Sequence, residues 1–324
     1  MRRVLSLLVK IAVSAGLLYL SLRRVNIETI GQQLSRLDWK WSLLALLICC
    51  GQIPLSAWRW REIVTVCRSQ LSQTLAMRYT VIGQFFSQVL PSTVGGDAVR
   101  IWLLARGGAG WQIAIYSVLI DRVIGVTALA LIVATCLPWT FELVHDAAGR
   151  TALLLIGFGA IGAALVFLGL GIPHLKVLDR WWPTRHLATA SRLTWRLCTS
   201  PAALRVAVVS FAIHFMTVAL AWSAATAVHA SITFSQTLYL FLPVLLIATI
   251  PISIAGWGVR ESAMVLAFSY AGLAESDGLI VSILYGLTTL AVGVIGGIVW
   301  IASGYRWGSV KTIEADTLEH DTSA

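Results

Sequence analysis

Residues 91–100 read PSTVGGDAVR, and residues 251–260 read PISIAGWGVR. Aligned without gaps, the two stretches share a proline, a glycine, a valine and an arginine, and four further positions carry near-equivalent residues. A proline, small residues and then an arginine interrupt an apolar run in both places. The repeated break predicts a duplicated, broken membrane element. The alternative is that two loops share the same turn residues by chance.

The composition predicts a helical membrane protein. Of 324 residues, 58% are hydrophobic and 12% are charged, and the mean hydropathy is +0.82. Soluble domains carry about 25% charged residues. The sequence also lacks the short, alternating, turn-separated segments of an outer-membrane barrel. The net charge of +9 predicts basic cytoplasmic loops first and an anionic ligand second.

The cysteines and the N-terminal run each have a simple interpretation. The five cysteines show no metal-ligand spacing and no disulfide framework, so we expect neither a metal nor a cofactor. The first apolar run ends at Arg23 and Arg24 without a clear cleavage site. It is therefore predicted to be a retained first span rather than a signal peptide.

Two kinds of apolar segment follow along the chain. Two stretches, 73–90 and 237–250, lead into the repeated motifs, and their continuations are too short to span, because a span needs about 20 residues. Each is predicted to form a re-entrant helical hairpin, with its tip at Pro91 or Pro251. Six full spans are predicted at about 4–22, 41–57, 113–136, 151–172, 206–227 and 279–303.

The distribution of Lys and Arg predicts the orientation. The strongly basic connector 173–205 is placed in the cytoplasm, which puts both termini there and 138–150 and 228–236 outside. The fold predicted is thus an all-α polytopic membrane protein with inverted repeats. Its expected location is the bacterial inner, or cytoplasmic, membrane. The predicted parts are one transmembrane domain, 1–305, with repeats of about 1–137 and 151–303, and a polar, disordered cytoplasmic tail, 306–324.

The two predicted tips combine three features that favour an anion. Each begins a short helix, whose N-terminus offers unpaired N–H groups and partial positive charge. Glycines let a ligand approach the backbone closely, and an arginine about one turn further adds a fixed charge. Two such ends from opposite faces predict a site for a phosphate. The candidate head-group residues are Gly95, Gly96, Arg100, Gly256, Gly258 and Arg260.

The same charges have a structural alternative. Buried ionisable groups in membranes are often paired only to hold helices together. Asp97, Asp121, Arg122 and Glu261 are the candidates for charge pairing or coupling. At membrane depth the sequence places five basic residues and three acidic ones, an excess that pairing alone does not remove.

The polar residues nearby remain open to two interpretations. Gln84 and Gln88 lie four residues apart on one helix face. They either line a head-group site or cap the broken hairpin backbone. His214, in the middle of an apolar span, is expected to be a hydrogen-bonded packing residue.

The two motifs, the stretch Asp121-Arg-Val-Ile-Gly125 and the stretch Arg59-Trp-Arg61 resemble the lysylphosphatidylglycerol synthase transmembrane-region family, also called flippase-like. The resemblance covers about residues 1–305. The family includes the membrane half of the bacterial multiple peptide resistance factor, which is associated with moving aminoacylated phosphatidylglycerol between leaflets. The resemblance implies lipid translocation without identifying the lipid. About 20 polar residues follow the last span, so the chain is not expected to be a synthase itself.

The leading hypothesis is a flippase for an anionic or phosphate-bearing lipid. No Walker A loop is present, and no catalytic residue is assigned. One alternative is an integral lipid-modifying transferase that uses Asp97, Asp121 or Glu261. Another is a non-catalytic partner of a lipid or glycan synthase. The expected partners are a phospholipid or lipid-linked substrate and the membrane, not a nucleic acid.

Overall fold

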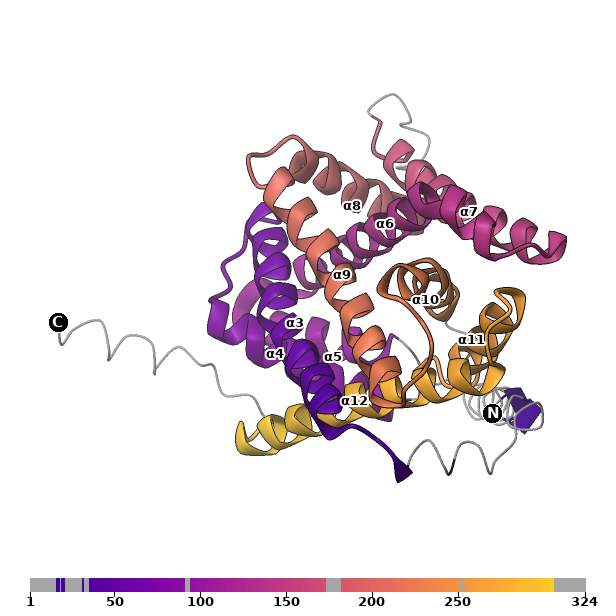
Figure 1. Cartoon of the computed structure of the whole chain (residues 1–324). Helices are drawn as coiled ribbons and strands as arrows, with labels where there is room; N and C mark the ends of the chain where they lie inside the picture. Colours follow the sequence, from indigo (N-terminus) through magenta and orange to yellow (C-terminus); the bar gives the residue numbers. More distant parts are fainter. Residues whose placement is uncertain are drawn as a thin grey trace.

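The computed structural model describes residues 16–17, 19–20, 31, 35–90, 94–172, 182–250, 253 and 255–305. Within these residues the chain is all helical. The predicted first span, the tips at Pro91 and Pro251, and the tail 306–324 fall largely or wholly outside the described residues. The helices keep the labels of Figure 1, which begin at α3.

Five helices are long and apolar enough to cross a membrane, which makes the chain a polytopic membrane protein. They match five of the six predicted full spans. Their bounds are Trp39–Val66 for α3, Trp111–Leu143 for α6, Ala147–Gly169 for α7, Ala203–Ala227 for α9 and Glu275–Ala302 for α12.

Two boundaries differ from the prediction for physical reasons. The helix α3 continues past residue 57 to Val66, because Trp60 and Ile63 are fully buried and packing extends the helix beyond the lipid-length run. The helix α6 contains Pro138 and runs on to Leu143, into the predicted connector.

Five shorter α-helices and one π-helical turn accompany the long helices in the described part of the chain. The helix α4 (Gln73–Val89) packs against α5 (Gly95–Leu104), and α10 (Phe234–Ala248) packs against α11 (Val259–Tyr270). A π-helical turn, η1 (Ala105–Ala109), links α5 to α6. The helix α8 (Trp182–Cys198) lies in the basic connector and packs on α6 and α7.

The helices pack across the two halves of the chain as well as within them. The long helices α3 and α9 pack together near the centre, α4 packs on α12, and α10 packs on α6 (Figure 1). The helix α5 lies on α6, and α11 lies on α12. The short helices α4, α5, α10 and α11 therefore pack on long helices, and the motif residues 95–97 and 259–260 are buried.

Candidate functional site

A polar cavity lies where the short helices meet the long ones. It consists of two connected parts, of about 320 and 260 Å³, which we call the α11 arm and the α5 arm of the inner cavity. Residues from α4, α6, α9 and α10 line both arms, and each arm adds residues of the short helix for which it is named. The residues common to both arms are Gln84, Ser87, Arg122, Leu129, Ile213, His214 and Thr249.

The α5 arm holds a continuous row of ion pairs, which we call the charge ladder. Arg59 Nε lies 2.8 Å from Asp121 Oδ1, and Arg100 Nη2 lies 3.0 Å from Asp121 Oδ2. Arg100 Nη1 lies 3.5 Å from Asp97 Oδ1, and Arg122 Nε donates to Asp97 Oδ2. Three guanidinium groups thus alternate with two carboxylates, which leaves one excess positive charge.

The ladder brings together residues that the sequence singled out separately. Asp97 and Arg100 come from α5, and Asp121 and Arg122 come from α6. Both aspartates are buried, whereas 46% of the Arg122 side chain is exposed to the cavity. Arg122 is therefore the ladder residue best placed to meet a ligand, although the sequence suggested it only for charge pairing or coupling.

Sequence reasoning missed Arg59 as a site residue. It lies just beyond the predicted end of the second span at residue 57, but α3 extends past that point and carries Arg59 into the ladder. A second contact, from Arg59 Nη1 to Ser210 Oγ at 3.3 Å, joins it to α9. The neighbouring Trp60 lies under Arg100, with the guanidinium carbon 4.1 Å from the ring centroid. The usable signal was the Arg59-Trp-Arg61 stretch itself, which places a charge and an indole on successive residues.

The α11 arm contains a second, separate ion pair. Arg260 Nη2 lies 2.7 Å from Glu261 Oε1, and Arg260 Nε donates to Ser282 Oγ at 2.9 Å. The other carboxylate oxygen of Glu261 accepts from the backbone N–H of Gly258 at 2.6 Å, which caps α11. The guanidinium of Arg260 also lies 5.1 Å from the ring centroids of both Trp257 and Tyr285. Arg260 is thus held rigidly, as a preorganised anion-binding group would be.

The four glycines of the motifs do two different things. Gly95 and Gly96 are helical, and a methyl group on Gly96 would overlap with the Gly83 carbonyl oxygen and Ser87 Oγ of α4. They allow the two short helices to touch. Gly256 and Gly258 have φ angles of 81° and 84°, a conformation that favours glycine. Gly256 therefore requires glycine because of its backbone angle. Gly96 requires glycine because α4 and α5 pack closely at that point.

The polar residues suggested by the sequence also reach the cavity. Gln84 lines both arms and Gln88 lines the α11 arm. Gln88 Nε2 donates to Thr289 Oγ1 of α12 at 3.4 Å, rather than to hairpin backbone. His214 shares a 2.9 Å hydrogen bond with the Gly125 carbonyl oxygen, which is the packing role expected for it.

The charges of the cavity determine what it can bind. In the α11 arm, Arg122 and Arg260 are basic, and none of the described residues that line this arm is acidic. Within the described ranges, no group of three or more His, Cys, Asp or Glu side chains could hold a metal ion. Two arginines therefore line this arm, and their charge favours an anionic ligand.

One of two comparisons with known proteins gives a match. A search of curated proteins finds no match. The family model described as "Lysylphosphatidylglycerol synthase TM region" matches residues 7–297, which include all the helices named above except the last residues of α12. By this match over most of its length, the chain belongs to the lysylphosphatidylglycerol synthase TM region family.

Proposed function

We propose that this protein moves an anionic or zwitterionic phosphate-bearing lipid between the leaflets of a membrane. The observation that carries the proposal is the α11 arm, where Arg122 and Arg260 line a polar cavity that has no acidic residue among its described lining. Guanidinium groups bind phosphate oxygens in pairs of charge-assisted hydrogen bonds. Family membership supports a lipid as the carrier of that phosphate.

The transport mechanism we propose rests on inverted repeats. The contacts support this: if α3, α4, α5 and α6 are exchanged with α9, α10, α11 and α12, each packing pair has a counterpart. The pair α4–α12 corresponds to α10–α6, α5–α6 corresponds to α11–α12, and α3–α9 corresponds to itself. A two-fold relation between halves of about 1–137 and 151–303 produces this pattern, as in many transporters.

The short helices are proposed to form the two re-entrant hairpins. With 17, 10, 15 and 12 residues, α4, α5, α10 and α11 are each shorter than a span. Their polar ends face a cavity, which is where broken backbone is tolerated at membrane depth. Hairpins entering from opposite faces, with tips at Pro91 and Pro251, would give each leaflet access to one arm.

The cellular setting follows from the same proposal. We place residues 1–305 as one domain in the bacterial cytoplasmic membrane, with both termini in the cytoplasm, because this orientation keeps most of the basic residues inside. The substrate is then the principal partner. A lipid or glycan synthase that supplies it would be the second.

A lipid-modifying transferase has less support from the geometry. Such an enzyme would use Asp97, Asp121 or Glu261 as an acid or base. Each oxygen of these three carboxylates already accepts a hydrogen bond from an arginine, a serine or a backbone N–H. No oxygen of these carboxylates is left without a hydrogen-bond donor to act as a proton acceptor.

Leaflet exchange of labelled phospholipids in liposomes tests the proposal. Arg100→Ala and Arg260→Ala are expected to reduce exchange about 10- to 150-fold, the equivalent of one charge-assisted hydrogen bond of about 1.5–3 kcal/mol. Lysine at either position is expected to restore exchange only in part, because a point charge replaces a planar fork. Arg61→Ala is the control, since Arg61 pairs with Glu62 and does not line the cavity. Full activity of both alanine variants would refute the anion site.

A further inference from the structure

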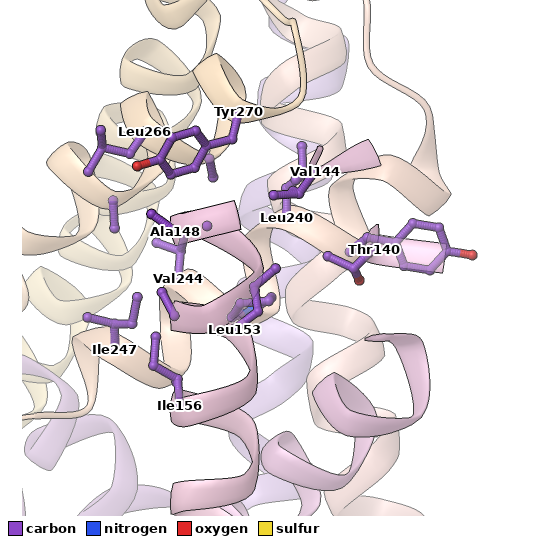
Figure 2. A pocket seen from close by; sticks show the side chains of 16 residues that line it. Thr140, Val144, Ala148, Leu153, Ile156, Leu240, Val244, Ile247, Leu266 and Tyr270 are labelled. Carbon is purple, nitrogen blue, oxygen red and sulfur yellow. The ribbon is translucent and has the colours of Figure 1, made fainter. Parts of the chain in front are cut away.

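A third cavity, of about 200 Å³, lies on the other side of α10 from the inner cavity. We call it the outer pocket; it is bounded by α6, α7, α10 and α11 (Figure 2). On α10, Leu240, Val244 and Ile247 line the outer pocket, whereas Leu245 and Ala248 line the inner cavity. Since successive helical residues are rotated by about 100°, α10 forms the wall between the two spaces.

The outer pocket is apolar and opens toward lipid. Its lining is almost entirely hydrocarbon, and the labelled side chains of Val144, Leu153, Ile156 and Val244 converge in Figure 2. Its mouth is formed by exposed residues of α7 and α11, namely Ala148, Ala152, Leu266 and Tyr270. The helix α7 is the least buried of the five candidate spans. A hydrocarbon chain in the bilayer can therefore enter the pocket sideways.

The outer pocket and the inner cavity approach each other at one end of α10. Ile247 lines the outer pocket, and the next residue, Ala248, lines the inner cavity and ends the helix. On α11, Arg260 lines the inner cavity and Ala263 lines the outer pocket. Residues three apart on a helix have Cβ atoms about 5–6 Å apart. Residues that line the two spaces are thus neighbours on both α10 and α11.

From this arrangement we infer that the outer pocket binds one acyl chain of the lipid whose phosphate lies between Arg122 and Arg260. The inference rests on the proposed function. A head group and its acyl chains are covalently joined, so a phosphate site inside the protein requires an apolar path that begins beside it. In this proposal the path runs past the end of α10 into the outer pocket, where the small side chains of Ala148, Ala152 and Ala263 leave room for a chain.

The outer pocket is expected to bind an acyl chain weakly, so that the lipid can dissociate after transport. Bilayer hydrocarbon is as apolar as the pocket lining, so a chain gains little from the hydrophobic effect on entering. Selectivity then depends on packing within the pocket and on the phosphate held at its end. An acyl chain bound in this way stays beside its own head group while that head group crosses the membrane.

The test uses phosphatidylglycerol with a photoactivatable diazirine in the middle of one acyl chain. The full-length protein is reconstituted with this probe, irradiated, and its cross-linked peptides are mapped by mass spectrometry. Cross-links are expected on pocket residues of α7, α10 and α11. Ala152→Phe, which fills the pocket, should reduce them at least fivefold. Leu155→Phe, on the same helix but exposed and outside the pocket, should change them less than twofold.

A second variant shows whether head group and chain belong to one lipid. Arg122→Gln removes a cavity charge and should also reduce pocket cross-links at least fivefold. Thermal unfolding in detergent confirms that each variant is folded. If Arg122→Gln is not folded, Arg122→Ala replaces it, and if Ala152→Phe is not folded, Ala152→Leu replaces it. If Ala152→Phe or removal of the arginine charge leaves the cross-links unchanged, the probe is non-specific boundary lipid and the inference is overturned. The inference is also overturned if the pocket is found to be occupied by residues 1–34 of the chain or by another protein.

Leaflet exchange measured in the same vesicles separates the two proposals. Exchange by the wild type without pocket-specific cross-links would refute the acyl-chain site alone. Pocket-specific cross-links without exchange of any phospholipid would refute the transport function while supporting the site.

Discussion

At the scale of single residues, the charge ladder depends on Asp121 more than on any one arginine. Asp121 accepts hydrogen bonds from both Arg59 and Arg100. Asp121→Asn would leave these two guanidinium groups facing a neutral amide. Removing one partner from a buried ion pair costs about 3–5 kcal/mol, and we expect a loss of this order. The free energy of unfolding in detergent, from chemical or thermal denaturation, measures it.

Arg59→Met should be milder than Asp121→Asn. The carboxylate of Asp121 would keep Arg100 as its partner, and the aliphatic part of Met replaces the buried stem of Arg59. The double variant should lose less than the sum of the two single losses, because each change removes the same contact. Strict additivity in this double-mutant cycle would show that the 2.8 Å pair contributes no coupling.

Two elements, the α4–α5 pair and the segment before α11, depend on glycine for different reasons, and the difference is testable. A methyl group at Gly96 meets backbone of α4, which cannot move without separating the helices. At Gly256 the nearest atom to an added methyl group is Ala248 Cβ at 3.7 Å, so the only cost is backbone strain at a φ of 81°. That strain is about 1–2 kcal/mol. Gly162 on α7 has nothing within 4 Å.

We therefore expect Gly96→Ala to destabilise the protein most, Gly256→Ala to cost about 1–2 kcal/mol, and Gly162→Ala to be neutral or slightly stabilising, because alanine favours helix. Thermal unfolding of the three variants in one detergent gives the order. Equal losses would mean that all three glycines serve general packing between membrane helices. A neutral Gly96→Ala would contradict the close contact between α4 and α5.

The elements themselves were largely predictable, and their contacts were not. Apolar length identified five long helices, and proline with glycine marked where α4 and α10 end. The sequence placed Arg100, Asp121 and Arg122 in the interior, but Arg59 was missed because the end of α3 is set by tertiary packing of Trp60 and Ile63, not by apolar run length. The packing role of Gly96 likewise depends on which helix lies opposite, and that partner is not local in sequence.

At the scale of the whole molecule, the proposed topology makes Cys198 a native reporter. It is exposed on α8, within the basic connector predicted to be cytoplasmic, whereas Cys49 and Cys67 are buried. The span α7 separates it from His145, and α9 separates it from Ser231; both of these residues are exposed. Two crossings from the same connector put His145 and Ser231 on one face of the membrane and Cys198 on the other.

A membrane-impermeant maleimide should therefore label His145→Cys and Ser231→Cys, in a Cys198→Ser background, in intact cells. Wild-type Cys198 should react only after permeabilisation, because the positive-inside rule places its connector in the cytoplasm. Partial desolvation of the Cys198 thiol by its neighbours raises its pKa. Less thiolate is therefore present near neutral pH, and labelling should be run at an alkaline pH. Protection of Cys198 is then due to the membrane only if permeabilised cells label fully at the same pH. Labelling of residues 145 and 231 from different sides of the membrane would contradict the count of crossings. It would also contradict the proposed inverted repeats, in which each arm of the inner cavity is open to a different leaflet.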